Sequence, residues 1–247
     1  MESAVTVARE DTPHGEVALR RRGEVLELVV DGAFAMDTVD TSTERLLAEV
    51  ALAEVPGPRR VLDGGLGLGF TARAVLADSR VEHLDVVELA EPLVRWARES
   101  LVPELAGLEG PRCSLHVADV VDVLLGRDGP RGPWDLVLLD VDNGPDFLVH
   151  AHNAALYDGP ALAAARAAVR PGGALVVWSS HRAPALLGGL EAVAGEGDEV
   201  AELVVVVERE GRSLDYALYR LRRPGRPAAS SGATGRRRPA GRTAWRG

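Results

Sequence analysis

A glycine-rich loop between residues 61 and 71 has the composition of a nucleotide-binding turn. The segment reads Val-Leu-Asp-Gly-Gly-Leu-Gly-Leu-Gly-Phe-Thr, which is an apolar strand, a run of alternating glycines and a helix start. Glycine is needed where a backbone turns sharply and lies against a ligand without interference from a Cβ atom. Glu88 closes the next apolar run, where a carboxylate can accept hydrogen bonds from both ribose hydroxyls. We therefore predict nucleoside binding by Gly65, Gly67, Gly69 and Glu88, in preference to a merely structural turn.

Two kinds of nucleotide fit this loop. Residues 67–72, Gly-Leu-Gly-Phe-Thr-Ala, also match the dinucleotide pattern G-x-G-x-x-A. Asp63, however, stands at the end of the preceding strand, where its charge would repel a pyrophosphate and attract an ammonium or a sulfonium group. We therefore add Asp63 to the predicted binding residues and expect an adenosyl-sulfonium donor, S-adenosylmethionine or its decarboxylated form.

Asp119 ends the third apolar run, in Val117-Ala118-Asp119. A carboxylate at this place can accept a hydrogen bond from an adenine amino group. It can also cap the helix expected to begin at the next residue. One aspartate can do both, and Asp119 is included among the predicted cofactor-binding residues.

Polar residues gather after the apolar run 136–139, in Asp140-Val-Asp142-Asn143-Gly-Pro. In a doubly wound sheet this run lies beside the glycine-loop strand, so these residues face the crevice in which ligands bind. Transfer from a sulfonium is an in-line displacement, and an amine must be neutral when it attacks. Asp140 is the predicted base that takes the amine proton. Asp142 and Asn143 are interpreted as turn residues, either of which can reach the acceptor.

A metal site is not predicted. His150 and His152 would share a face only on a strand, and their segment has the composition of a loop or helix start. The single cysteine, Cys113, excludes a disulfide within the chain and a C-x-x-C site. Trp178 follows a buried run and is expected in the core or in a pocket wall.

Charge is distributed unevenly along the chain. The net charge is −9, from 28 basic and 37 acidic residues, and every basic residue is arginine. Seven of the arginines and no acid lie in 223–247, so the rest carries 21 basic against 37 acidic residues, near −16. Such an acidic body disfavours nucleic acid and suits a small cationic partner. The absence of lysine excludes Schiff-base and P-loop chemistry.

The middle of the chain alternates between strand and helix patterns, which predicts an α/β fold with a doubly wound, Rossmann-like, mostly parallel sheet. The expected parallel strands are 60–63, 84–88, 114–117, 136–140 and 174–179. The expected helices are 71–77, 91–100, 120–125 and 160–169. Runs at 202–207 and 216–221, around a Glu-Gly-Arg turn, predict a final antiparallel pair.

Three regions are expected. Residues 1–54 should hold a loose start over 1–13, a β-hairpin from runs at 16–21 and 24–30, and a linker helix capped near Thr41. Residues 55–222 should form the donor-binding domain, and 223–247, rich in Pro, Gly, Ser, Ala and Arg, a disordered tail. Neither a signal-peptide pattern nor an apolar run near ~18 residues is present, so we expect a cytoplasmic protein without membrane association.

In their order, these motifs resemble the spermidine synthase family of polyamine aminopropyltransferases, a branch of the class I S-adenosylmethionine-dependent methyltransferase-like fold. The resemblance covers roughly residues 14–222. It is carried by Asp31-Gly32, the glycine loop, Val87-Glu88-Leu89, Ala118-Asp119, residues 140–145 and Pro171-Gly172-Gly173. It implies adenosyl binding by Gly65, Gly67, Glu88 and Asp119, an amine-activating base at Asp140, and polyamine biosynthesis as the setting. It also leaves a homodimer open.

The sequence departs from the family pattern mainly on the polyamine side. The family's loop has an aspartate, which holds the amine of the aminopropyl group, where this chain has Leu68. Asn143 replaces the second aspartate of the family's catalytic segment, although Asp40 matches the family. Other positions of the family's polyamine channel also differ, and they hold Ala35, Glu44, and Trp178 with Ser179. The residues that would bind the donor are kept, whereas several of those that would bind the polyamine are replaced.

Three functions follow from these observations. The favoured one is a transferase that moves an aminopropyl group from decarboxylated S-adenosylmethionine to a small cationic amine. Leu68 keeps methyl transfer from intact S-adenosylmethionine to a small molecule as an alternative, because the loop carboxylate that would repel that donor's carboxylate is missing. A non-catalytic adenosyl-binding homologue is a further alternative. An NAD-type oxidoreductase is the weakest, since no hydride-transfer constellation is evident.

Overall fold

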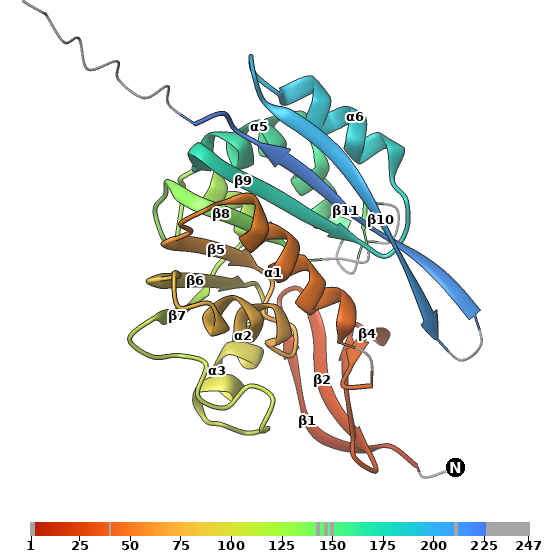
Figure 1. The fold of residues 1–247 in the computed structure, drawn as a ribbon. Helices are drawn as coiled ribbons and strands as arrows, with labels where there is room; N and C mark the ends of the chain where they lie inside the picture. Colours follow the sequence, from red (N-terminus) through yellow and green to blue (C-terminus); the bar gives the residue numbers. More distant parts are fainter. Residues whose placement is uncertain are drawn as a thin grey trace, which may run out of the picture.

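The described part of the chain is built around one seven-stranded sheet (Figure 1). The computed structural model describes residues 3–39, 41–141, 144–145, 148, 151–209 and 212–225. The strand order is β10-β11-β9-β8-β5-β6-β7. These strands are β5 (Arg60–Gly64), β6 (His83–Glu88), β7 (Cys113–Val117), β8 (Trp134–Leu139), β9 (Val169–Ser179), β10 (Glu199–Arg209) and β11 (Arg212–Arg222).

The sheet is parallel except at one edge. The pairs β5/β6, β6/β7, β5/β8 and β8/β9 are parallel, whereas β11 pairs antiparallel with both β9 and β10. The strand order reverses between β5 and β8, and this is the switch point at which open α/β sheets bind ligands. The predicted doubly wound sheet with antiparallel end strands is confirmed.

Helices cover both faces of the sheet. Leu136 and Leu138 of β8 belong to a core shared with α1, α2 and α3, whereas Val137 and Leu139 belong to a second core with α4, α5 and α6. Successive side chains of a strand point to opposite faces, so a strand buried on both sides needs an unbroken apolar run. The helices are α1 (Ser42–Glu54), α2 (Phe70–Ala77), α3 (Glu91–Arg98), α4 (Val120–Leu124), α5 (Gly159–Ala168) and α6 (Pro184–Val193), with a 3-10 helix η1 (Ala151–Tyr157).

A separate antiparallel sheet precedes α1, with the order β1-β2-β3-β4. Its strands are β1 (Val5–Thr12), β2 (Gly15–Arg22), β3 (Val25–Val30) and β4 (Ala33–Asp37). The predicted hairpin is the central pair, β2 with β3. Leu19 of β2 and Leu26 of β3 are fully buried in the core that contains α1, α2 and α3. The sheet is therefore fixed to the larger sheet by hydrophobic packing.

The expectation of a loose start over 1–13 is wrong. β1 pairs with β2 from Val5 to Thr12, with a bulge between Thr6 and Ala8. Most of this edge strand is exposed, so its sequence lacks the two-residue period that marks a half-buried strand. β4 was not predicted either, and Asp31-Gly32 connects it to β3. Asp31 and Gly32 have φ values of 50° and 76°, as a two-residue hairpin turn requires.

The C-terminal half differs from expectation in three places. β9 begins at Val169 instead of 174, and its register with β8 shifts between Trp134 and Leu136, so Pro-Gly-Gly at 171–173 is a step within the strand. α6 was not predicted, because its two central glycines are a poor helix signal. Arg223 and Pro224, expected in the tail, hydrogen-bond with Gly173 and Gly172. The rest of the predicted tail, from residue 226, lies outside the described residues.

None of the described helices has the length and hydropathy needed to cross a membrane.

Replacing Leu138 by alanine should lower the free energy of unfolding by about 2–5 kcal/mol, because its side chain is fully buried at the centre of the sheet. Leu203→Ala is the matched control. Leu203 lies on the edge strand β10 with 45% of its surface exposed, and its loss should change stability by less than about 1 kcal/mol. Urea unfolding followed by circular dichroism measures both. Equal effects of the two substitutions would contradict the central position of β8.

Candidate functional site

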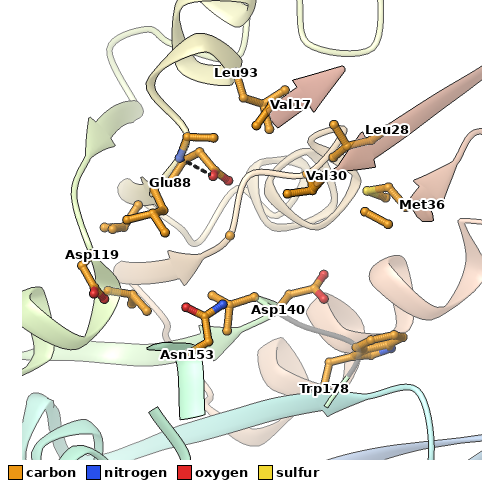
Figure 2. A pocket seen from close by; sticks show the side chains of 18 of the residues that line it. Val17, Leu28, Val30, Met36, Glu88, Leu93, Asp119, Asp140, Asn153 and Trp178 are labelled. Carbon is orange, nitrogen blue, oxygen red and sulfur yellow. Dashed lines mark hydrogen bonds between the residues drawn. The ribbon is translucent and has the colours of Figure 1, made fainter. Parts of the chain in front are cut away.

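A cavity lies at the carboxyl ends of β5, β6 and β8, where the N-terminal sheet meets the larger sheet (Figure 2). In this view Glu88 and Asp119 lie on one side, Met36 and Trp178 lie on the other, and Asp140 lies between them. All five residues line the cavity. This is the edge at which the sequence predicted a ligand.

Two glycines of the loop line the cavity in backbone conformations that other residues rarely adopt. Gly65 has a φ of 108°, and a Cβ atom there would lie 2.0 Å from the carbonyl oxygen of Asp140. Gly67 has a φ of 49°, and a Cβ atom there would lie 2.7 Å from the sulfur of Met36. The loop therefore packs directly against the end of β8 and against β4, which only glycine permits.

Three other residues of the loop do not line the cavity. Gly69 caps the start of α2 with a φ of 81°, and a Cβ atom there would lie 2.6 Å from Leu108. Leu68 is fully buried in the core. Asp63 is also fully buried, and its carboxylate accepts no hydrogen bond from the described residues. Burial, reinforced by the charges of Asp140 and Glu88, raises the pKa of Asp63 well above its usual range. Its position therefore offers no direct contact with a bound sulfonium.

Glu88 is held rigidly at the end of β6. Its two carboxylate oxygens accept backbone N–H groups of Leu66 and Ala90, at 2.9 and 2.8 Å. Burial raises the pKa of Glu88, and these backbone donors act in the opposite direction. The carboxylate is thus placed against the glycine loop, where the sequence predicted a ribose partner.

Asp119 has the helix-capping role that the sequence left open, because its side chain accepts the backbone N–H of Val121 at 2.8 Å and caps α4. It also lines the cavity. A cap uses one oxygen of a carboxylate that can accept several hydrogen bonds, so contact with a ligand remains compatible with capping.

Asp140 and Glu44 form the acidic centre of the site. Asp140 follows β8, and its carboxylate is 3.3 Å from the hydroxyl of Thr71 on α2. Glu44 lies in the first turn of α1 and accepts the Thr43 hydroxyl at 2.9 Å. Burial and the charge of Glu44 raise the pKa of Asp140 to about 7, and the Thr71 hydroxyl opposes that rise. Asp140 is therefore a base that can change its protonation near neutral pH.

The side of the cavity formed by the N-terminal sheet is apolar. Its residues come from β2, β3 and β4, and they are Val17, Leu28, Val30, Ala35 and Met36. Trp178 of β9 also lines the cavity, as predicted, and its ring lies 5.6 Å from that of Tyr216. Ala35 and Glu44, which were identified as departures from the family pattern, both line the cavity.

Some lining residues had no signal in the sequence. Val17, Leu28, Val30 and Met36 are ordinary strand residues, and only the docking of the N-terminal sheet brings them to the site. Asn153 of η1 was also missed. The predicted residues Asp142 and Asn143, as well as His150 and the side chain of His152, lie outside the described residues. Among the residues that are described, no cluster of His, Cys, Asp and Glu could hold a metal ion.

The lining is acidic overall. Its described residues include four carboxylic acids and no arginine or histidine, and the acids are Glu44, Glu88, Asp119 and Asp140. A site of this kind attracts cations and repels anions.

Related sequences match the central part of the chain. The profile of the Spermine/spermidine synthase domain matches residues 41–184. Spermidine synthase 1 of Hyoscyamus niger is 31% identical over 147 residues, which are 59% of this chain and 44% of that protein. The polyamine aminopropyltransferase of Mycobacterium tuberculosis is 33% identical over 174 residues, 69% of this chain and 32% of that protein. The chain thus spans less than half the length of these relatives.

Solved structures share the fold at low sequence identity. Spermidine synthase from Thermotoga maritima has a TM-score of 0.72 and 16% identity, and the match covers 87% of this chain and 72% of that chain. A spermidine synthase in complex with the transition-state analogue AdoDATO has a TM-score of 0.70 and 18% identity, covering 86% and 72%. Because the domain profile covers more than half of the sequence, this chain belongs to the spermine/spermidine synthase family.

Proposed function

We propose that this chain transfers an aminopropyl group from decarboxylated S-adenosylmethionine to a small amine. The observation that carries the proposal is the charge of the cavity, whose described lining has four acids and no basic side chain. The decarboxylated donor has a sulfonium and an ammonium group and no carboxylate, so its charges complement this lining. The carboxylate of intact S-adenosylmethionine would meet only like charges among the described side chains.

The relatives support the same reaction. Those that match this chain are named as spermidine synthase, spermine synthase and polyamine aminopropyltransferase. One solved relative of the same fold is a complex with the transition-state analogue AdoDATO. We place the adenosyl group against Gly65 and Gly67, its ribose at Glu88 and its adenine at Asp119. Asp63 receives no contact with the donor in this proposal, and Gly69 only starts α2.

Asp140 is proposed as the catalytic base. The acceptor arrives as an ammonium ion and gives one proton to the Asp140 carboxylate. The nitrogen lone pair then forms a bond to the carbon beside the sulfonium, the carbon–sulfur bond breaks, and a neutral thioether leaves. Glu44 lies close enough to raise the pKa of Asp140 and therefore strengthens it as a base. Asp142 and Asn143 remain predicted contacts of the acceptor.

Methyl transfer from intact S-adenosylmethionine is the second candidate. The observation in its favour is Leu68, whose side chain is fully buried, so the loop offers no acid for the ammonium of an aminopropyl group.

The two donors separate these candidates. Calorimetry should show that the purified chain binds decarboxylated S-adenosylmethionine at least about tenfold more tightly than the intact donor, the ratio that ~1.4 kcal/mol of charge repulsion produces. Mass spectrometry of an amine incubated with both donors should show the aminopropyl adduct. Tight binding of the intact donor alone, with a methylated product, would establish the second candidate.

Asp140→Asn should reduce turnover by about 10²–10⁴-fold, because an amide of the same shape cannot accept the amine proton. The dissociation constant for the donor should change only a few-fold. Asp122→Asn is the matched control, since Asp122 does not line the cavity and 43% of its side chain is exposed. Unchanged turnover in the Asp140 variant would show that Asp140 is not the base. An unaltered chain that binds the donor and gives no product would instead be an adenosyl-binding homologue.

The rate should depend on pH with a midpoint near 7, rising toward high pH, because Asp140 must be ionised to act as a base. Glu44→Gln removes one cause of the raised pKa and should move this midpoint to lower pH. Glu49→Gln, on the exposed side of the same helix, should leave it in place. The profiles are measured as kcat/KM against pH, because kcat/KM reports the pKa of the base before the substrate binds. A shift to higher pH in the Glu44 variant would contradict the proposed coupling.

A further inference from the structure

One wall of the cavity carries no charged side chain. Its only side-chain atom that can accept a hydrogen bond is a thioether sulfur. We name Val17, Leu28, Val30, Ala35 and Met36 the apolar wall. In Figure 2 Met36 lies on the opposite side of Asp140 from Asp119. An adenosyl group at Glu88 and Asp119 therefore leaves the part of the apolar wall around Met36, together with Trp178, to the acceptor.

The charges on the acceptor's side of the cavity lie together at one end. Glu44 and Asp140 both line the cavity. The Thr71 hydroxyl lies 3.4 Å from the backbone carbonyl oxygen of Glu44 and 3.3 Å from the carboxylate of Asp140, so the two residues are close neighbours. The other acids of the N-terminal sheet face elsewhere. Glu27 of β3 pairs with Arg20 and Arg22. Asp37, at the end of β4, accepts the backbone N–H of Val39 and does not line the cavity. Among the described lining residues, no anion stands on the apolar wall.

We propose that the acceptor is a monoamine with a hydrocarbon body. Its ammonium group lies between Glu44 and Asp140, and its carbon chain lies on the apolar wall. The inference rests on the proposed function and specifies its substrate class. The nitrogen between the two carboxylates gives its proton to Asp140 and takes the alkyl group from the sulfonium, so bonds and charges balance as in the proposed reaction.

Desolvation makes the distinction between one and two amino groups large. A second ammonium on the apolar wall would lose its water without gaining a counter-charge from the described residues of that wall, which is far more costly than leaving it in solvent. A methyl group at the same place has no strong hydration to lose. Its burial is favourable because it removes apolar surface from water. Each buried methylene should improve kcat/KM by roughly fourfold, the ratio that corresponds to its transfer from water.

The test compares n-pentylamine with diaminobutane, which has the same length but carries a second amino group in place of the terminal methyl group. With decarboxylated S-adenosylmethionine as donor, kcat/KM for n-pentylamine should exceed that for diaminobutane by at least about tenfold. The series from n-propylamine to n-pentylamine should rise by roughly fourfold per methylene. Equal or better use of diaminobutane would overturn the inference.

A substitution in the apolar wall provides a second test. Ala35→Glu adds a carboxylate to the wall and should raise kcat/KM for diaminobutane relative to n-pentylamine by about tenfold or more. Phe34→Glu is the matched control, because Phe34 is the neighbouring residue of the same strand, is 47% exposed and does not line the cavity. It should leave the ratio unchanged. An unchanged ratio in a folded Ala35 variant, verified by circular dichroism, would count against the inference.

Failure of the proposed function gives a different result. In that case neither donor is consumed with any amine, although the chain is folded. The class of amine is then decided by binding, with calorimetry of n-pentylamine and of diaminobutane against the whole chain. Tighter binding of n-pentylamine would support the inference without the reaction, and tighter binding of diaminobutane would refute it.

Discussion

The close approach of β5 and β8 at their carboxyl ends determines the geometry of the site. Gly65 faces the backbone of Asp140 so closely that a Cβ atom would overlap the carbonyl oxygen. The backbone N–H of Asp140 donates to the carbonyl oxygen of Gly64 at 2.8 Å, which continues the parallel pairing by one residue. The donor loop and the proposed base are therefore joined by main-chain contacts. These contacts fix the position of the base relative to the donor loop, as a reaction that needs in-line attack requires.

The second constraint is the burial of acids that have no basic partner among the described side chains of the site. Burial is the largest cause of the raised pKa values of Asp63, Glu88 and Asp140. A carboxyl group whose folded-state pKa is raised favours the folded state only while it is protonated, so for Asp140 this contribution is lost as the pH rises from about 4 to about 7. A cationic ligand supplies the missing counter-charge. Glu88 and Asp140, which line the cavity, thus favour a sulfonium and an ammonium within it.

The N-terminal sheet forms one wall of the cavity at the end of the larger sheet. Its buried residues share a core with α1, α2 and α3, and Glu10 of β1 pairs with Arg95 of α3 at 2.5 Å. The sulfur of Met36 lies 3.2 Å from the backbone nitrogen of Leu68, in the glycine loop. The sheet therefore contacts the donor loop directly and also forms the wall on which an acceptor would lie. In this chain that wall is hydrocarbon, which is the physical reason to expect an acceptor different from a diamine.

The sequence by itself determined the alternating strands and helices of the parallel sheet, and it predicted a site at the carboxyl ends of those strands. Local signals were sufficient for these features: the apolar run 136–139, the alternating glycines, and acids such as Glu88, Asp119 and Asp140 at strand ends. Only the tertiary structure decided which of these residues face the cavity. Asp63 and Gly65 are two residues apart, yet one is sealed in the core and the other lines the site, because the chain turns between them. The structure also brought the apolar wall to the site from strands about thirty residues or more before the loop. No local pattern marks such residues, since their role depends on packing between two sheets and not on their neighbours in sequence.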